Sequence, residues 1–179
     1  MFVFVYICLY LLVGLYKAHI LSYIEYLTPA IAHACATTLG PVEAIQARFL
    51  REIGLSEEDA LLHFNLAPLH TRRNIAILGV IHRAARGIGP PHLRRLFPLR
   101  TGVAGNARHA FQVEDLAQDC GQEYIRRSAF GHVSVYNALT PDLVHAPAVK
   151  SFQQGLQARL CEMAKSGVVC WQYMYRPII

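Results

Sequence analysis

The sequence has few charged side chains and no group of residues spaced like a metal site. Charged residues make up 16% of its 179 residues, and hydrophobic residues make up 54%. This composition excludes intrinsic disorder as the dominant state, because so much apolar surface can offset the entropy lost on ordering the chain. The length suits one ordinary domain, so we expect a single hydrophobic core.

Closely spaced cysteines and histidines are also missing. The five cysteines are scattered without a CxxC pair, and the nine histidines form no HxxxH or HExxH pair. This spacing predicts no metal site, because structural zinc needs such clusters. We expect reduced, mostly buried thiols in an intracellular protein, and histidines that serve individually in the core or at the surface.

Motifs for phosphate loops and catalysis are absent too. Neither GxxxxGK[ST] nor GxGxxG occurs, and Gly87-Ile88-Gly89 is followed by Pro90-Pro91, which lack the amide donors of a phosphate nest. The acidic run Glu57 to Asp59 suits the first turn of a helix. Ser128 and Ser134 lack the context of a nucleophile elbow. The sequence therefore predicts no catalytic residue, no cofactor, no small-molecule substrate and no enzyme.

Positive charge is concentrated in the middle third. Residues 1–40 and 109–179 are each balanced, whereas residues 41–108 carry ten arginines against five acidic residues, 10 − 5 = +5. The ten are Arg48, Arg51, Arg72, Arg73, Arg83, Arg86, Arg94, Arg95, Arg100 and Arg108. Guanidinium groups suit phosphate, so this segment is compatible with nucleic acid. Solvated helix faces and helix C-terminal caps are the alternative interpretation.

Residues 1–16 are uncharged and almost wholly apolar. As a helix they span about 24 Å, slightly less than the ~30 Å hydrocarbon core of a bilayer. A longer span to residue 28 would place Lys17 near its middle, at a cost of about 2.5 to 3.5 kcal/mol. A signal peptide would need basic residues at its start, which are missing. A membrane helix, a helix packed within a larger protein and a buried strand from Phe2 to Tyr10 all stay open.

Glycines and prolines mark the expected helix ends in the first half of the chain. Pro29 predicts a kink or a restart of the first long helix. Gly40-Pro41 predicts a stop followed by a new amphipathic helix, which Gly54 closes. Ser56 is the expected N-cap of the next helix, with Asp59 three residues later as in a capping box.

The second half carries similar signals. Pro68 opens a helix whose residues 75–81 are apolar on every side, which suits the centre of a bundle. Residues 87–91 end that helix, and a short helical turn precedes Pro98. A last helix is expected from Val149 to Met163, ending at Ser166-Gly167.

These signals predict a mainly α protein: a small irregular helical bundle with a hydrophobic N-terminal helix and a long exposed loop around 99–123, with a short extended piece at 109–113. The expected parts are a hydrophobic helix 1–28, a helical basic core 29–98, the loop 99–123, a C-terminal helical segment 124–166 and an aromatic tail 167–179.

Four segments in the chain carry patterns that occur together in one family. They are Leu15 to Tyr26; Ile45-Gln46, Arg48 to Arg51 and Gly54; Leu66 to Leu69, Arg72-Arg73, Leu78-Gly79, Ile81 to Arg83 and Gly89-Pro90; and Arg126 to Ser128, Phe130, Tyr136-Asn137, Leu139, Pro141 and Ser151-Phe152. In this order they resemble the thumb and the region after it in reverse transcriptases of non-LTR (LINE-type) retrotransposons. Tyr136 stands where tryptophan is commoner, and Pro141 lies one residue later than usual.

The resemblance covers about residues 15–165 and implies a fragment without the polymerase palm or the endonuclease. The family's catalytic aspartates lie in a YxDD-type motif, and no Asp-Asp pair occurs here. The implied function is weak, sequence-independent binding of RNA or DNA backbone by Arg48, Arg51, Arg72, Arg73, Arg83 and Arg86. The alternatives are a single-pass or peripheral membrane protein anchored through residues 1–28, and a reading frame that is not expressed.

Overall fold

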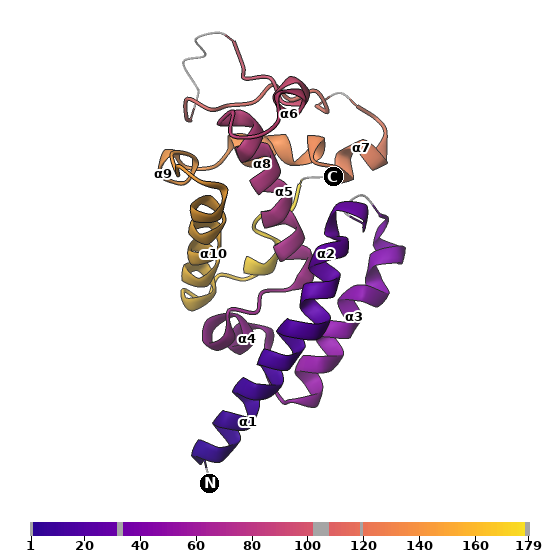
Figure 1. Ribbon diagram of the computed structural model, residues 1–179, viewed down its shortest axis with the longest axis vertical. Coiled ribbons are helices and arrows are strands. Elements are labelled where there is room, and N and C mark those ends of the chain that lie inside the picture. Colours follow the sequence, from indigo (N-terminus) through magenta and orange to yellow (C-terminus); the bar gives the residue numbers. More distant parts are fainter. Residues whose placement is uncertain (1, 32–33, 102–107, 119, 178–179) are drawn as a thin grey trace. The chain divides into compact units, whose positions relative to one another are not determined.

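The chain is mainly helical, as the sequence predicts (Figure 1). A computed structural model describes residues 2–31, 34–101, 108–118 and 120–177, and for residues 2–6, 29 and 30 it describes the backbone alone. Residues 102–107 and 119 of the expected loop, Met1 of the expected first helix and residues 178–179 of the expected tail lie outside these ranges. The described residues contain no β-strand and only one isolated antiparallel bridge, between Leu99 and Val113.

The helices follow one another along the chain, most of them with short connections, and the longest connection runs from Phe97 to Gln122 between α6 and α7. In order they are α1 (Phe2–Leu15), the π-helical turn η1 (Tyr16–Leu21), α2 (Ser22–Ile31), α3 (Ala36–Glu52), α4 (Glu57–Phe64), α5 (Leu69–Ala85), α6 (Pro91–Leu96), α7 (Glu123–Arg127), the 3₁₀ turn η2 (Phe130–His132), α8 (Val133–Asn137), α9 (Pro141–Val144), α10 (Val149–Lys165) and the 3₁₀ turn η3 (Trp171–Tyr173).

The chain divides into two compact units, where the sequence analysis expected a single core. Unit 1 comprises Met1–Arg73 and unit 2 comprises Asn74–Ile179. The boundary falls inside α5, and therefore inside the expected basic core 29–98. A helix boundary signal could not reveal it, because α5 continues without interruption through residue 74.

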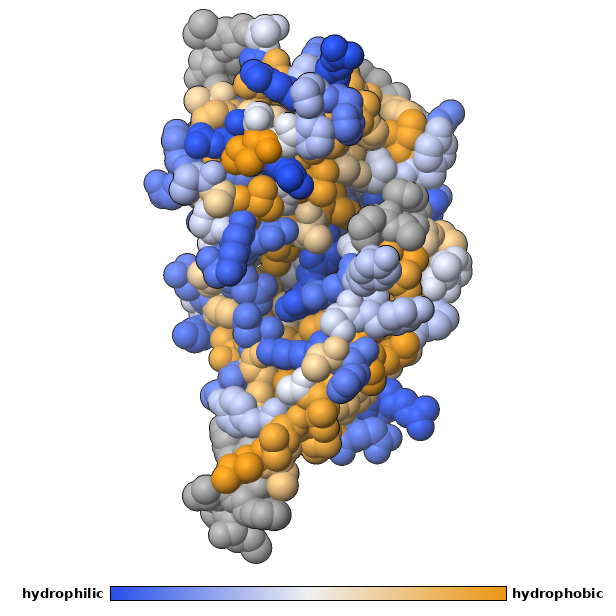
Figure 2. Space-filling view, in the orientation of Figure 1, coloured by the Kyte–Doolittle hydropathy of each residue, from blue (hydrophilic) through white to orange (hydrophobic). Residues whose placement is uncertain are grey.

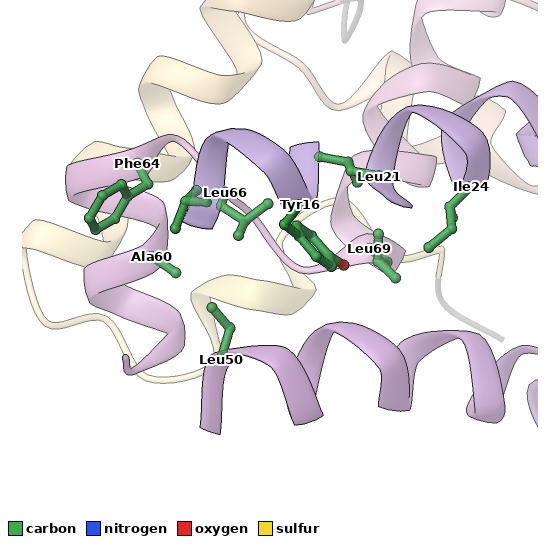
Figure 3. Packing of buried hydrophobic residues seen from close by; sticks show 9 residues of the cluster. Tyr16, Leu21, Ile24, Leu50, Ala60, Phe64, Leu66 and Leu69 are labelled. Atoms are coloured by element: carbon green, nitrogen blue, oxygen red, sulfur yellow. The ribbon is translucent and has the colours of Figure 1, made fainter. Parts of the chain in front are cut away.

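In unit 1, α1, η1 and α2 form one long helix with a buried face. Val13, Tyr16, Leu21 and Ile24 join Leu50 of α3 in an apolar cluster that also contains residues of α4 and the α4–α5 connection (Figure 3). Tyr16 stacks on Phe49 with ring centroids 4.2 Å apart. The five-residue spacing of Tyr16 and Leu21 matches the wider π-helical turn between them. The strand alternative for Phe2 to Tyr10 is wrong, because these residues are helical.

The opposite face of α1 is apolar and exposed. Hydrophobic side chains gather along α1 in Figure 2, next to the grey N-terminal atoms. Its exposed large residues include Ile7, Leu11, Leu12 and Leu15, and Leu11 is 63% exposed. By length and composition the stretch Ile7–Thr28 is able to cross a membrane. Patches of this kind mark interaction surfaces more often than isolated exposed leucines do.

Two proline signals in unit 1 were misinterpreted. Residues 40 and 41 lie inside α3, which begins at Ala36, so they do not end a helix. Gly40 has no Cβ to clash with the Pro41 ring, so the helix continues through the pair at the cost of one backbone hydrogen bond. Similarly, Pro29 does not restart the first helix, because α2 continues to Ile31. Because Pro29 lies in the last turn of α2, its missing amide removes only one backbone hydrogen bond at the end of the helix.

The expected helix caps are confirmed. Ser56 Oγ accepts a hydrogen bond from the Asp59 amide at 3.0 Å and so caps α4. Gly54, Gly87 and Gly167 adopt positive φ after α3, α5 and α10. At each of these glycines both backbone hydrogen bonds of a Schellman motif are present. After α3, for example, the Gly54 amide donates to Arg51 O and the Leu55 amide donates to Leu50 O.

Unit 2 is built around the C-terminal half of α5 and α10. Phe152, Leu156 and Leu160 of α10 are buried as expected, and Gly79 of α5 lies close to the Gln153 side chain. His82 of α5 stacks on Phe152 with ring centroids 4.1 Å apart. A side chain at residue 79 would therefore require the Gln153 side chain to move.

Two irregular parts of unit 2 are packed against the rest of the unit. In the segment expected to be an exposed loop, His109, Val113 and Ala117 are buried. Arg100 N bonds Gln112 O beside the Leu99–Val113 bridge, which agrees with the expected extended piece. In the aromatic tail, the Tyr175 hydroxyl donates to Leu156 O at 2.9 Å. The tail therefore docks on α10.

Candidate nucleic-acid interface

Two of the six predicted phosphate-binding arginines are ion-paired inside unit 1. Arg72 donates from Nε to Oε1 of Glu25 on α2 at 2.6 Å. Arg73, which is buried, forms an ion pair with Glu43 on α3. Because they are neighbours in α5, the two side chains leave the helix in different directions and reach different partners. Their charges are largely compensated within the unit.

Glu43 is the centre of this internal network. Its Oε2 accepts a hydrogen bond from the His70 amide at 3.3 Å. Burial would raise the pKa of its carboxyl, but the side chain of His70 and the guanidinium of Arg73 outweigh burial and hold the pKa below its ordinary value. Glu43 is therefore ionised at neutral pH, as a partner of buried Arg73 must be.

Lys17 also serves the interior of unit 1. Its ammonium donates to the main-chain oxygen of Phe64 at the end of α4. Burial, together with the nearby positive charge of Arg72, lowers the pKa of Lys17. This cation is thus engaged in joining η1 to α4.

Arg48 and Arg51 lie on the solvent side of α3. Both are exposed, three residues apart and on one helix face, and no ion pair is seen for either among the described residues. Phe49 and Leu50, which pack on the apolar cluster, lie on the other side. Both arginines are therefore accessible to an external anion.

Arg83 and Arg86 belong to unit 2 and differ in their surroundings. The Arg86 guanidinium lies over the Phe111 ring, 4.5 Å from its centroid, and the side chain is partly buried. Arg83 is exposed, and its stem passes beside Gly89: a Cβ built on Gly89 would lie 3.3 Å from Arg83 Cγ. Arg83 is the more available of the two for a phosphate.

The structure adds Arg94 and Arg95, which the sequence-based site omitted. A hollow of about 350 Å³ lies at the connection between α5 and α6, two helices that Figure 1 labels. It is lined by Gly87, Gly89, Pro91, Arg94 and Arg95. The Arg94 guanidinium lies against Gly87, where an added Cβ would be 3.5 Å from Nη1. Both arginines are exposed, and the described part of unit 2 shows no ion pair to them.

A signal for this cluster exists in the sequence. From Ala60 to Val113 the chain contains eight arginines and no aspartate or glutamate. From the sequence alone, residues 87–91 predict only the end of a helix and lack the amide donors of a phosphate-binding nest. These small residues let side chains from α5 and α6 come together. That role is a tertiary effect and is not visible in the linear pattern.

Within the described residues no group of three or more His, Cys, Asp or Glu side chains could hold a metal ion. The buried histidines of unit 2 have hydrogen-bonded structural surroundings instead. His82 Nε2 contacts Ala146 O at 3.1 Å and Nδ1 contacts the Tyr136 hydroxyl at 3.3 Å. Burial lowers the pKa of His82, although the Ala146 hydrogen bond opposes the shift. A neutral ring satisfies both contacts.

Comparison of the chain with protein-family models, with curated proteins and with solved structures finds no match.

Proposed function

We propose that the protein binds the phosphate backbone of RNA or DNA without sequence preference. The observation that carries the proposal is the presence of Arg94 and Arg95 in the lining of the hollow in unit 2, with the stem of exposed Arg83 beside Gly89 of the same lining. No acidic residue lies within the 60–113 segment to compensate them. Guanidinium groups offer paired donors that fit phosphate oxygens, and such contacts give affinity without reading bases.

A helix-capping role does not account for these arginines. The last carbonyls of α5 already have backbone partners, since Ile88 N bonds Arg83 O and Gly87 N bonds Ala84 O. No guanidinium is needed there to satisfy the helix end. The charges are therefore available to an external anion.

The resemblance to non-LTR reverse transcriptases supports the same proposal. A thumb-like segment detached from its palm would keep contacts to a primer–template backbone and would have no polymerase activity. In unit 2 the proposed contacts are Arg83, Arg94 and Arg95. In unit 1, taken by itself, they are Arg48 and Arg51, whereas Arg72, Arg73 and Arg86 serve mainly internal contacts.

Fluorescence anisotropy with labelled single strands of unrelated sequence tests the proposal. At 50 mM salt we expect equal affinity for a homopolymer and a mixed sequence. Arg83→Glu should weaken binding roughly fivefold more than Arg159→Glu, an exposed arginine on α10 outside the hollow. Equal effects of the two reversals, or strong preference for one sequence, would overturn it.

A second candidate function, attachment to a membrane surface, is favoured by the exposed apolar face of α1. Ile7, Leu11 and Leu15 present uncharged side chains along this face, and exposed Tyr23 and Tyr26 follow in α2. Apolar and aromatic side chains of this kind enter the interfacial region of a bilayer.

The packing of unit 1 favours a helix lying on the membrane over one that crosses it. The other face of the long helix packs on α3, which carries exposed Arg48, Arg51 and Glu52. A crossing helix would have to leave α3 or take these charges into hydrocarbon, at about 2.5 to 3.5 kcal/mol each for the arginines.

Flotation with neutral phosphatidylcholine vesicles tests this second candidate. The wild-type protein should float, and Leu11→Asp should remain at the bottom of the gradient. Ala47→Asp, which adds the same charge to an exposed position of α3, should float like the wild type. Carbonate washing should release a surface-bound protein. Resistance to carbonate would instead indicate a crossing helix, and absence of flotation would exclude the candidate.

A further inference from the structure

The hollow of unit 2 is open to solvent and is large enough to receive an anionic group. It has a volume of about 350 Å³, and its wall is formed by Gly87, Gly89 and Pro91 together with Arg94 and Arg95. At about 30 Å³ per water molecule this is room for roughly ten waters, which is enough for a phosphate with its sugar. A backbone phosphate on a flat basic surface would need no such recess.

The glycines keep the recess open and bring the cations close to it. An added Cβ on Gly89 would lie 3.2 Å from Leu93 Cδ2 and 3.3 Å from Arg83 Cγ. Gly87 has φ +66°, which a residue with a side chain adopts only with strain. Arg83 and Arg94 can therefore approach the connection from α5 and from α6.

Resting on the proposed function, we propose that this hollow binds the terminal phosphate of a nucleic-acid strand. A terminal phosphomonoester carries about −1.5 to −2 charge and three acceptor oxygens, as a phosphorylated side chain does. A backbone phosphodiester carries one charge and is flanked by two sugars. In the hollow, the larger charge and the third acceptor oxygen of the terminal group match the two arginine forks better than a backbone phosphate does.

The test compares three single strands of one sequence, labelled internally, that carry a 5′-phosphate, a 3′-phosphate or two hydroxyl ends. The full-length protein should bind one or both phosphorylated strands about tenfold more tightly than the hydroxyl strand. In Arg94→Ala/Arg95→Ala this preference should disappear. Both side chains are exposed, so the variant should keep the circular dichroism of the wild type.

Arg48→Ala/Arg51→Ala is the matched control, because it removes two exposed arginines of unit 1. It should weaken binding of all three strands equally and preserve the preference. Millimolar inorganic phosphate should abolish the preference, and it should not lower the affinity for any strand below that of Arg94→Ala/Arg95→Ala.

The outcomes separate this inference from the proposed function. No binding of any strand would remove both. Equal binding of the three strands would overturn the terminal-phosphate site and leave backbone binding in place. A preference that survives in Arg94→Ala/Arg95→Ala would place the end site elsewhere, and binding of inorganic phosphate without any end preference would make the hollow a site for free phosphate; each result contradicts the inference.

Discussion

Three cations of unit 1 contact partners inside that unit, namely Lys17, Arg72 and Arg73. Arg73 is buried and forms an ion pair with Glu43. The Glu43 carboxylate also accepts a hydrogen bond from the His70 amide. A buried cation without its partner costs more than the pair contributes, because the desolvated charge is left behind. Glu43 is therefore the residue whose loss should be felt most.

We expect Glu43→Gln to destabilise unit 1 by about 1 to 2 kcal/mol, since it removes the charge opposite Arg73 and preserves the size of the side chain. Urea unfolding followed by circular dichroism measures the change. Glu52→Gln, on the exposed side of α3, is the control and should change stability by less than about 0.5 kcal/mol. Equal losses in the two variants would show that the Arg73 pair contributes nothing.

Cys35 should be the fastest of the cysteines to react. Hydrogen bonds to the Thr37 hydroxyl at 2.9 Å and the Thr38 hydroxyl at 3.1 Å lower the pKa of its thiol to about 6. Burial raises the pKa of Cys161. At pH 7, iodoacetamide should therefore label Cys35 well before Cys161, as read by mass spectrometry of peptides.

Thr37→Val/Thr38→Val should slow labelling of Cys35 and leave Cys161 unchanged; equal rates in the wild type would disprove the assignment.

The five thiols are free, as expected, but none of them is fully buried, so the expectation of mostly buried thiols is wrong.

At the scale of single residues, the sequence could identify the composition of the site and not its geometry. The arginine excess was visible, but a linear pattern cannot show that Arg72 and Arg73 meet carboxylates 47 and 30 positions away. The acid-free run of arginines indicates a basic segment but does not single out Arg94 and Arg95, because the hollow that they line arises from the turn between α5 and α6.

At the scale of helices, local chemistry determines the ends. The αL positions of Gly54, Gly87 and Gly167 could be predicted, because a glycine after an amphipathic run is a local signal. The continuation of α3 through Gly40-Pro41 could not be predicted, because proline normally marks a helix boundary and here lies inside a helix.

Two glycine substitutions in unit 1 should therefore have opposite effects. Gly54→Ala forces a Cβ into a positive φ of 68° and should cost about 1 kcal/mol. Gly14→Ala lies inside α1 with no atom within 4 Å of the added Cβ, and should stabilise by about 0.5 to 1 kcal/mol. Urea midpoints for the two variants should lie on either side of the wild type; a shared direction would contradict the cap assignment.

At the scale of the whole molecule, the chain consists of two units with different uses of histidine and arginine. Unit 2 buries His82, His109 and His132, whose pKa values burial lowers. The mainly α class followed from helical periodicity. The division into two units did not, because periodicity says nothing about which helices share a core.

The buried histidines predict loss of stability in mild acid. Below their ordinary pKa of 6.5 the unfolded chain binds protons that the folded chain does not. Stability from these residues is thus fully present above pH 6.5 and decreases as the pH falls. The thermal midpoint should drop between pH 7 and pH 5, and the drop should be smaller in His132→Asn. An identical drop in the variant would exclude His132 as a contributor.

The dependence of single-strand affinity on salt is the most direct test of the central claim, that exposed arginines of unit 2 bind backbone phosphates. The logarithm of the association constant should fall linearly with the logarithm of salt concentration, with one slope for unrelated sequences. In Arg94→Ala/Arg95→Ala the slope should become shallower by roughly 1.4, about 0.7 for each lost phosphate contact. Affinity that ignores salt, or no binding at micromolar protein, would contradict the account.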